Sequence, residues 1–155
     1  NLGLNYRMTE IQSKIGDIQL KKLSTWHKKR SFNANQIANA LKQCKNVRVP
    51  LPSPPFEHAW YKFYAYLIPD ALAEGWDRER ILFEFNKEKT PVFSGSCSEI
   101  YLEKCMRNSY QNKKLPNAKS LGDTSLMFLV HPTIDKKSLD TYISRIVHVL
   151  NKACR

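Results

Sequence analysis

Two polar side chains, Asn5 and Arg7, come just before a stretch with the pattern of an amphipathic helix. A helix N-terminus carries a partial positive charge and free N–H groups, so it is a favourable place for a phosphate. An Asn amide adds a hydrogen-bond donor there, and an Arg guanidinium adds a bidentate fork. The alternative is structural: Asn5 forms a turn and Arg7 pairs with a surface carboxylate. These residue types alone leave the two interpretations equally open.

The second polar segment is the loop Ser-Gly-Ser-Cys-Ser at 94–98. It lacks the GxSxG pattern of a nucleophilic serine, so a turn with capping serines is favoured. A phosphate-binding role is the weaker alternative, because the GxxxxGK[ST] pattern is absent. Cys97 is favoured as an unreactive thiol. His131, at the exit of an apolar run, is favoured as a structural histidine that bonds to the backbone.

The four cysteines are scattered through the chain and form no CxxC pair. The four histidines are scattered as well, so no zinc site is expected, and we expect reduced thiols in a cytoplasmic protein. The net charge of +11 could serve a nucleic acid, but no RNA- or DNA-binding motif accompanies it. A smaller phosphate-bearing ligand, or an acidic surface elsewhere in the protein, is therefore the favoured explanation of the charge.

The hydrophobic pattern predicts helices and strands in the order α, β, α, β, α, β, α. Thr9 and Gln12 fit a capping box at the start of the first helix, and Asp77 and Asp135 fit N-caps of later helices. The apolar stripe is interrupted by lysines after residue 20, so we expect the first helix to bend or to change its packing partners there. The expected strands lie at 61–68, 91–93 and 126–130, and the other expected helices at 33–43, 77–87, 99–106, 117–124 and from 135. The proline-rich segment 49–55 is expected to be a connector inside one domain.

This order predicts an α+β fold: a small antiparallel or mixed three-stranded sheet packed with helices. No run of apolar residues is long enough to suggest a membrane span. The opening Asn-Leu-Gly-Leu has neither a starting Met nor the build of a signal peptide, so we expect the chain to begin within a larger protein.

The stretch GLNYRMTEIQSKIGDIQLKKL, residues 3–23, strongly resembles the segment G-x-N-Y-R-M-[ST]-E-[IL]-Q-A-A-[IL]-G-x-x-Q-L-x-x-L of the DegT/DnrJ/EryC1/StrS family. These are sugar aminotransferases of fold type I that depend on pyridoxal phosphate (PLP). YKFYAYLIP, TPVFSG and SLMFLVHPTID are similar, in this order, to the three strands of the family's small domain. The resemblance spans nearly all 155 residues, although only the first motif is specific.

The resemblance implies that residues 1–155 are the C-terminal small domain, with the inter-domain loop and helix at 1–48, and that the large PLP-binding domain lies upstream. The Schiff-base lysine would lie in that large domain, so this segment alone would be inactive. Asn5 matches the asparagine that reaches across a homodimer to the PLP phosphate, and Arg7 matches the basic position in the same loop. The implied reaction transfers an amino group from glutamate to a nucleotide-linked keto-sugar in polysaccharide or modified-sugar biosynthesis.

One part departs from the family pattern. Many members carry a His-Tyr-Pro-like stretch after the second small-domain strand, where it lines the sugar pocket. This chain has SGSCSEIYLEKC instead, which leaves pocket roles for Ser96, Glu99 and Tyr101 as weak expectations. A PLP-dependent sugar dehydratase of the same family is an alternative, and a basic module that binds RNA or another polyanion is a second. A purely structural or dimerising domain is the third.

Overall fold

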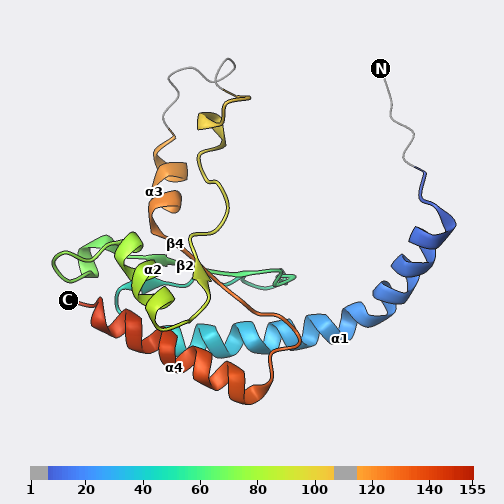
Figure 1. The fold of residues 1–155 in the computed structure, drawn as a ribbon, viewed down its shortest axis with the longest axis horizontal. Helices are drawn as coiled ribbons and strands as arrows, with labels where there is room; N and C mark the ends of the chain where they lie inside the picture. The colour runs from blue at the N-terminus through green and yellow to red at the C-terminus, as the bar shows by residue number, and fades with distance from the viewer. Residues whose placement is uncertain (1–6, 107–114) are drawn as a thin grey trace.

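The computed structural model describes residues 7–106 and 115–155. A sheet of four antiparallel strands, in the order β1-β2-β4-β3, forms its centre. The helices α1 and α4 lie side by side along one face of this sheet, and α2 contacts α4 (Figure 1). α3 contacts β2 and rises from the other side of the sheet (Figure 1). The α+β class predicted from the hydrophobic pattern is therefore confirmed.

The bounds of the elements agree with most of the expected positions. The helices are α1 (Glu10–Leu41), α2 (Arg78–Lys87), α3 (Pro116–Thr124) and α4 (Lys136–Lys152). The strands are β1 (Val47–Arg48), β2 (Phe63–Leu67), β3 (Val92–Phe93) and β4 (Ser125–Phe128), and two short 3-10 helices span Pro69–Ala71 and Ile100–Leu102.

Two expectations about short elements need correction. The sheet has four strands rather than three, because Val47 and Arg48 pair with Leu67 and Tyr66 of β2. The helix expected at 99–106 shrinks to the 3-10 turn Ile100–Leu102, whose N-cap residue makes no side-chain cap. A short helix needs a cap or a packed apolar face to persist in water, and both Ile100 and Leu102 are exposed.

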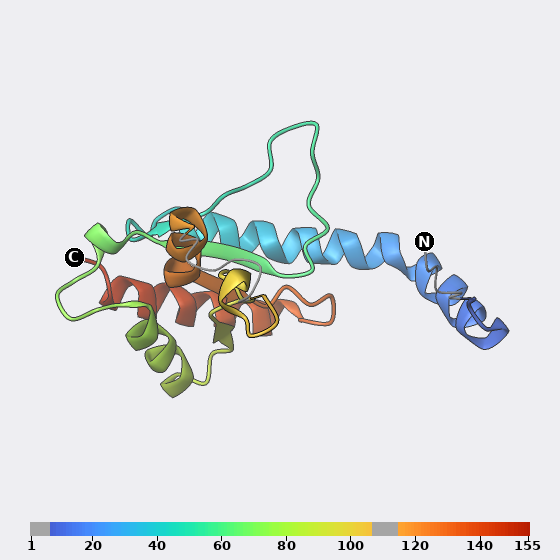
Figure 2. The ribbon, with the colours of Figure 1, turned by 90° about the horizontal axis from the view of Figure 1, so that it is seen from above.

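The first helix is one continuous element of 32 residues rather than two. Its start has the expected capping box: Gln12 N–H donates to Thr9 Oγ1 at 3.3 Å, and Thr9 N–H donates to Gln12 Oε1 at 3.0 Å. Figure 2 shows the helix bending in its N-terminal half, as the interrupted apolar stripe indicated.

The two halves of α1 differ in what they bury. The C-terminal half inserts Ile37, Ala38 and Leu41 into the core. In the N-terminal half, Ile11 is 74% exposed, and Ile15 and Ile18 are also exposed, as is Met8, just before the helix, at 68%. The helix predicted from the apolar pattern therefore forms, but within the described chain nothing packs on its apolar face.

One hydrophobic cluster holds the domain together. β2 contributes alternate residues to it, Phe63, Ala65 and Leu67, as expected for a strand with one face on the core. α2 contributes Ile81 and Phe85, and α4 contributes a stripe that includes Tyr142 and Ile146. Val47 and Trp60, on opposite sides of the proline-rich connector, belong to the same cluster. The connector therefore joins two parts of one core.

The connector forms an arch between β1 and β2 that stands away from the sheet (Figure 2, teal). Across residues 7–106 and 115–155, none of the helices combines the length and the apolar character that crossing a membrane requires.

Candidate functional site: two arms beside the sheet

The expected site residues lie on two separate arms of the molecule. Arg7 lies just before α1, at the end of the bent helix, while Ser96, Glu99 and Tyr101 lie in the segment between β3 and α3. Both views show these arms projecting from different places on the domain, and the chain does not bring them together (Figures 1 and 2). Asn5 lies outside the described residues.

The start of α1 has some of the features that a phosphate requires. Arg7 is exposed beside the positive end of a long helix. The capping box already uses the amides of Thr9 and Gln12, which leaves the amides of Glu10 and Ile11 at the first turn. Glu10 places a carboxylate in the same turn, which opposes a second anion. The helix start therefore offers the Arg7 guanidinium and two free amides, with one carboxylate beside them.

A complete PLP site needs more than this arm. PLP also needs a lysine for its aldehyde and partners for its ring. The exposed surroundings of Arg7 supply neither within the described chain. The described residues fit only the phosphate end of PLP.

The arm that follows β3 is built around a glycine. Gly95 has φ +93°, a conformation that L side chains rarely adopt, and a Cβ there would come within 2.7 Å of the Tyr64 ring. Ser125 Oγ donates to the carbonyl of Ser94, so the start of the arm is tied to β4. Ser96, one residue after the glycine, is exposed.

Glu99 and Tyr101 form a hydrogen-bonded pair on this arm. The Tyr101 hydroxyl donates to the Glu99 carboxylate and accepts from the Leu115 amide at 3.5 Å. The bond to the carboxylate raises the pKa of Tyr101, so this hydroxyl stays protonated at neutral pH. The pair offers a carboxylate and a phenol to a polar ligand such as a sugar hydroxyl.

The contacts of Cys97 and His131 agree with the prediction of an unreactive thiol and a structural histidine. The Cys97 thiol donates to Glu103 Oε1 at 3.3 Å, which raises the pKa of the thiol and disfavours the reactive thiolate. His131 Nδ1 lies 2.7 Å from the Thr133 hydroxyl and 3.4 Å from the Thr133 amide. In the part of the chain with assigned structure, no three His, Cys, Asp or Glu residues gather as metal ligands.

Sequence reasoning missed a polar clamp that holds the base of the arch on α1. His27 Nε2 donates to the carbonyl of His58 at 3.0 Å, and Arg30 Nη1 donates to the carbonyls of Trp60 and Tyr61 at 3.3 Å each. The Trp60 amide donates to His58 Nδ1 at 2.8 Å, which holds Trp60 at a positive φ of 49°. A positive φ on a bulky residue is rare. No local pattern in the sequence predicts it at Trp60, because the contacts that stabilise it form only in the folded chain.

The comparisons with known proteins match this fold. The model of the DegT/DnrJ/EryC1/StrS aminotransferase family matches residues 1–147, and the chain therefore belongs to this family. An aminotransferase from Psychrobacter cryohalolentis has 41% sequence identity and a TM-score of 0.90, over 99% of this chain and 41% of that protein.

Two further relatives are more distant. The 3-oxo-glucose-6-phosphate:glutamate aminotransferase of Bacillus subtilis is 22% identical over 156 residues, which cover 98% of this chain and 34% of that enzyme. GDP-4-keto-6-deoxy-D-mannose-3-dehydratase of E. coli, solved with bound hydrated PLP, is 21% identical with a TM-score of 0.77, over 96% of this chain and 36% of the enzyme. The chain thus spans between about a third and two fifths of the length of these relatives.

Proposed function

We propose that residues 1–155 are the C-terminal small domain of a longer PLP-dependent sugar aminotransferase. The observation that carries this proposal is the 41% identity, at a TM-score of 0.90, to the Psychrobacter aminotransferase over nearly the whole chain. Because the match covers only 41% of that protein, a large domain completes the enzyme. Residues 1–48 serve as the inter-domain loop and helix.

The cofactor of the complete enzyme is PLP, which supplies an electron sink for moving an amino group. Asn5 holds its phosphate across a homodimer, and Arg7 adds a positive charge at the start of α1. The lysine that binds the PLP aldehyde belongs to the large domain, so the 155-residue chain by itself transfers no amino group. The bent, exposed start of α1 supports a PLP site that is shared with another domain, because this helix end projects away from the core of its own domain.

The substrates are glutamate and a keto-sugar, which we propose is linked to a nucleotide. Ser96, Glu99 and Tyr101 contact the sugar from the arm after β3. Support comes from the hydrogen-bonded Glu99–Tyr101 pair and from the Bacillus relative, whose name gives a keto-sugar phosphate and glutamate as its substrates. The enzyme works in the cytoplasm, in polysaccharide or modified-sugar biosynthesis.

A second candidate is a sugar dehydratase of the same family. It is favoured by the likeness to the E. coli dehydratase, which covers 96% of this chain and 36% of that enzyme. The two reactions differ in chemistry that depends on the large domain, so the small domain serves either one.

The test uses the longer protein that contains these residues, loaded with PLP and passed through a desalting column. Asn5→Ala removes a hydrogen bond to a charged phosphate, so we expect PLP to bind about tenfold more weakly. Lys14→Ala, on the exposed surface of α1, is the control and should retain PLP as the unaltered protein does. Equal retention in Asn5→Ala would refute the phosphate role, and failure of the unaltered protein to retain PLP would refute the proposed cofactor.

A further inference from the structure

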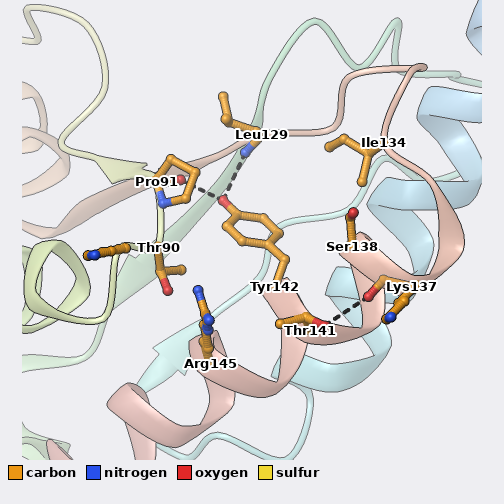
Figure 3. Close-up of a pocket in the computed structure, with 10 residues that line it drawn as sticks. Thr90, Pro91, Leu129, Ile134, Lys137, Ser138, Thr141, Tyr142 and Arg145 are labelled. Carbon is orange, nitrogen blue, oxygen red and sulfur yellow. Dashed lines mark hydrogen bonds between the residues drawn. The ribbon is translucent and has the colours of Figure 1, made fainter.

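A cleft of about 440 Å³ opens between the start of β3 and the N-terminal half of α4. It lies at the opposite end of β3 from Ser96, since Pro91 precedes the strand and Ser94 follows it. Figure 3 shows the Tyr142 ring in the middle of the cleft, with Pro91 and Leu129 beyond its hydroxyl group. A volume of this size is in the range of sites for small organic ligands. We call this site the β3–α4 cleft.

The apolar wall of the cleft is fixed before any ligand arrives. The Tyr142 side chain is buried, and its hydroxyl donates to the Pro91 carbonyl at 2.7 Å and accepts from the Leu129 amide at 3.2 Å (Figure 3). These bonds join α4 to the residue before β3 and the residue after β4, so they hold the ring in place. Ile134 adds a second apolar surface beside it. A flat apolar group can therefore pack here without first ordering the wall.

The rim of the cleft is strongly positive. Lys89, Lys137 and Arg145 all line it. The Asp135 carboxylate lies next to the lining, where it accepts from the Ser138 amide and hydroxyl at the N-cap of α4. None of the three cations forms an ion pair with a carboxylate in residues 7–106 or 115–155. Arg145 donates one N–H to the Glu88 carbonyl at 3.2 Å, which orients the guanidinium while its other donors stay available.

The hydroxyl groups of the cleft are already committed as donors. Thr90, Ser138 and Thr141 donate to protein acceptors at 3.2, 2.7 and 2.9 Å. These hydroxyl oxygens can therefore only accept further hydrogen bonds, and an anion needs donors. A negative group in this cleft must be held by the cations of the rim.

We propose that the β3–α4 cleft binds small organic anions, in which one anionic group meets Arg145 and the lysines while an apolar ring or alkyl body packs on Tyr142. The proposal stands on the cleft itself and is independent of the sugar aminotransferase function. It adds a ligand site on α4, where the family resemblance assigns none.

The probe is 2-naphthoate, which carries one carboxylate on a flat apolar body. It is titrated into the nitrogen-15-labelled 155-residue chain while amide resonances are followed by NMR. We expect saturable shifts at the amides around Thr90, Ser138 and Arg145. We expect 2-naphthamide, the neutral analogue, to bind about tenfold more weakly, because it lacks the charge that the rim recognises.

Two pairs of variants separate the cleft from general effects of charge. Arg145→Gln should weaken naphthoate binding about tenfold, whereas Lys14→Gln, which changes the net charge equally, should leave it unchanged. Thr141→Glu places a carboxylate in the cleft and should abolish saturable binding. Ser144→Glu adds the same charge to an exposed position of α4 outside the lining, and should preserve it.

The amide spectrum of each variant shows whether it is folded, and a variant that unfolds leaves the other pair to decide. Shifts confined to the exposed apolar start of α1 would overturn the proposal. So would equal affinities for naphthoate and naphthamide, or equal weakening by Arg145→Gln and Lys14→Gln.

Discussion

Replacing Tyr142 by Phe removes one oxygen atom that connects three elements of the fold. In the structure this hydroxyl donates to the Pro91 carbonyl before β3 and accepts from the Leu129 amide after β4. The variant keeps the aromatic ring, so the apolar packing of α4 on the core would change little. The substitution therefore isolates the polar connection between α4 and the sheet.

The magnitude follows from the two bonds and their exposure to water. Each hydrogen bond contributes about 0.5–1.5 kcal/mol net to folding. Pro91 is exposed, so water can satisfy its carbonyl when the hydroxyl is gone. Leu129 is half-buried, and leaving its amide unpaired adds a desolvation penalty. We expect the free energy of unfolding to fall by about 2 kcal/mol.

Urea denaturation of the 155-residue chain, followed by circular dichroism, measures this change. Tyr61→Phe is the matched control, because the Tyr61 side chain is 76% exposed and its variant should differ from the unaltered chain by less than about 0.5 kcal/mol. A Tyr142→Phe variant as stable as the Tyr61→Phe variant would refute the role assigned to the buried hydroxyl.

Three further results are expected. Burial raises the pKa of Tyr142 to about 12; its stabilising contribution is therefore complete below pH about 10, the ordinary pKa, and is lost between pH about 10 and 12. In urea titrations at increasing pH, the stability advantage of the unaltered chain over Tyr142→Phe should shrink in this window by up to about 1.4 kcal/mol per pH unit, and an unchanged advantage would contradict the burial effect. Gly95→Ala should destabilise by about 1–3 kcal/mol, because its φ of +93° and the nearby Tyr64 ring oppose a Cβ, whereas Gly16→Ala on the exposed surface of α1 should be neutral or stabilising; thermal melts of both variants decide. Thr9→Ala should cost the start of α1 about 1 kcal/mol and speed hydrogen exchange of the first-turn amides without changing global unfolding, and unchanged exchange would argue against the capping box.

The elements that sequence reasoning found are those with local signals. Asp77 and Asp135 cap α2 and α4 by accepting from the amides of Arg80 and Ser138, three residues on. β1 was missed because two residues carry no periodic pattern. Its existence depends on pairing with β2, where the Arg48 guanidinium also lies 4.8 Å from the centre of the Tyr66 ring.

Other features depend on what packs against a segment, which no local pattern records. Met8, Ile11, Ile15 and Ile18 recur at helical spacing on one face, yet all four are exposed. The segment expected as a helix at 99–106 likewise has no packing partner, since Ile100 and Leu102 are each 58% exposed. A pattern shows that a face is apolar without showing its partner.

The candidate site was predictable only in part. The motif at residues 3–23 indicated the family, and the family model confirms it. The separation of Arg7 from Ser96 and Tyr101 on two arms follows from the fold and could not be read from the chain. The β3–α4 cleft was missed because Lys89 and Arg145 are distant in sequence and meet only when α4 packs beside β3.

Amino transfer by the longer protein tests the central proposal most directly. That protein is incubated with PLP, a keto-sugar nucleotide and glutamate labelled with nitrogen-15, and the sugar product is analysed by mass spectrometry. We expect the label in the sugar, and no labelled sugar from the 155-residue chain alone. A deoxygenated sugar without the label would identify the dehydratase instead, and labelled sugar formed by the 155-residue chain alone would contradict the assignment of residues 1–155 as a small domain that needs a large one.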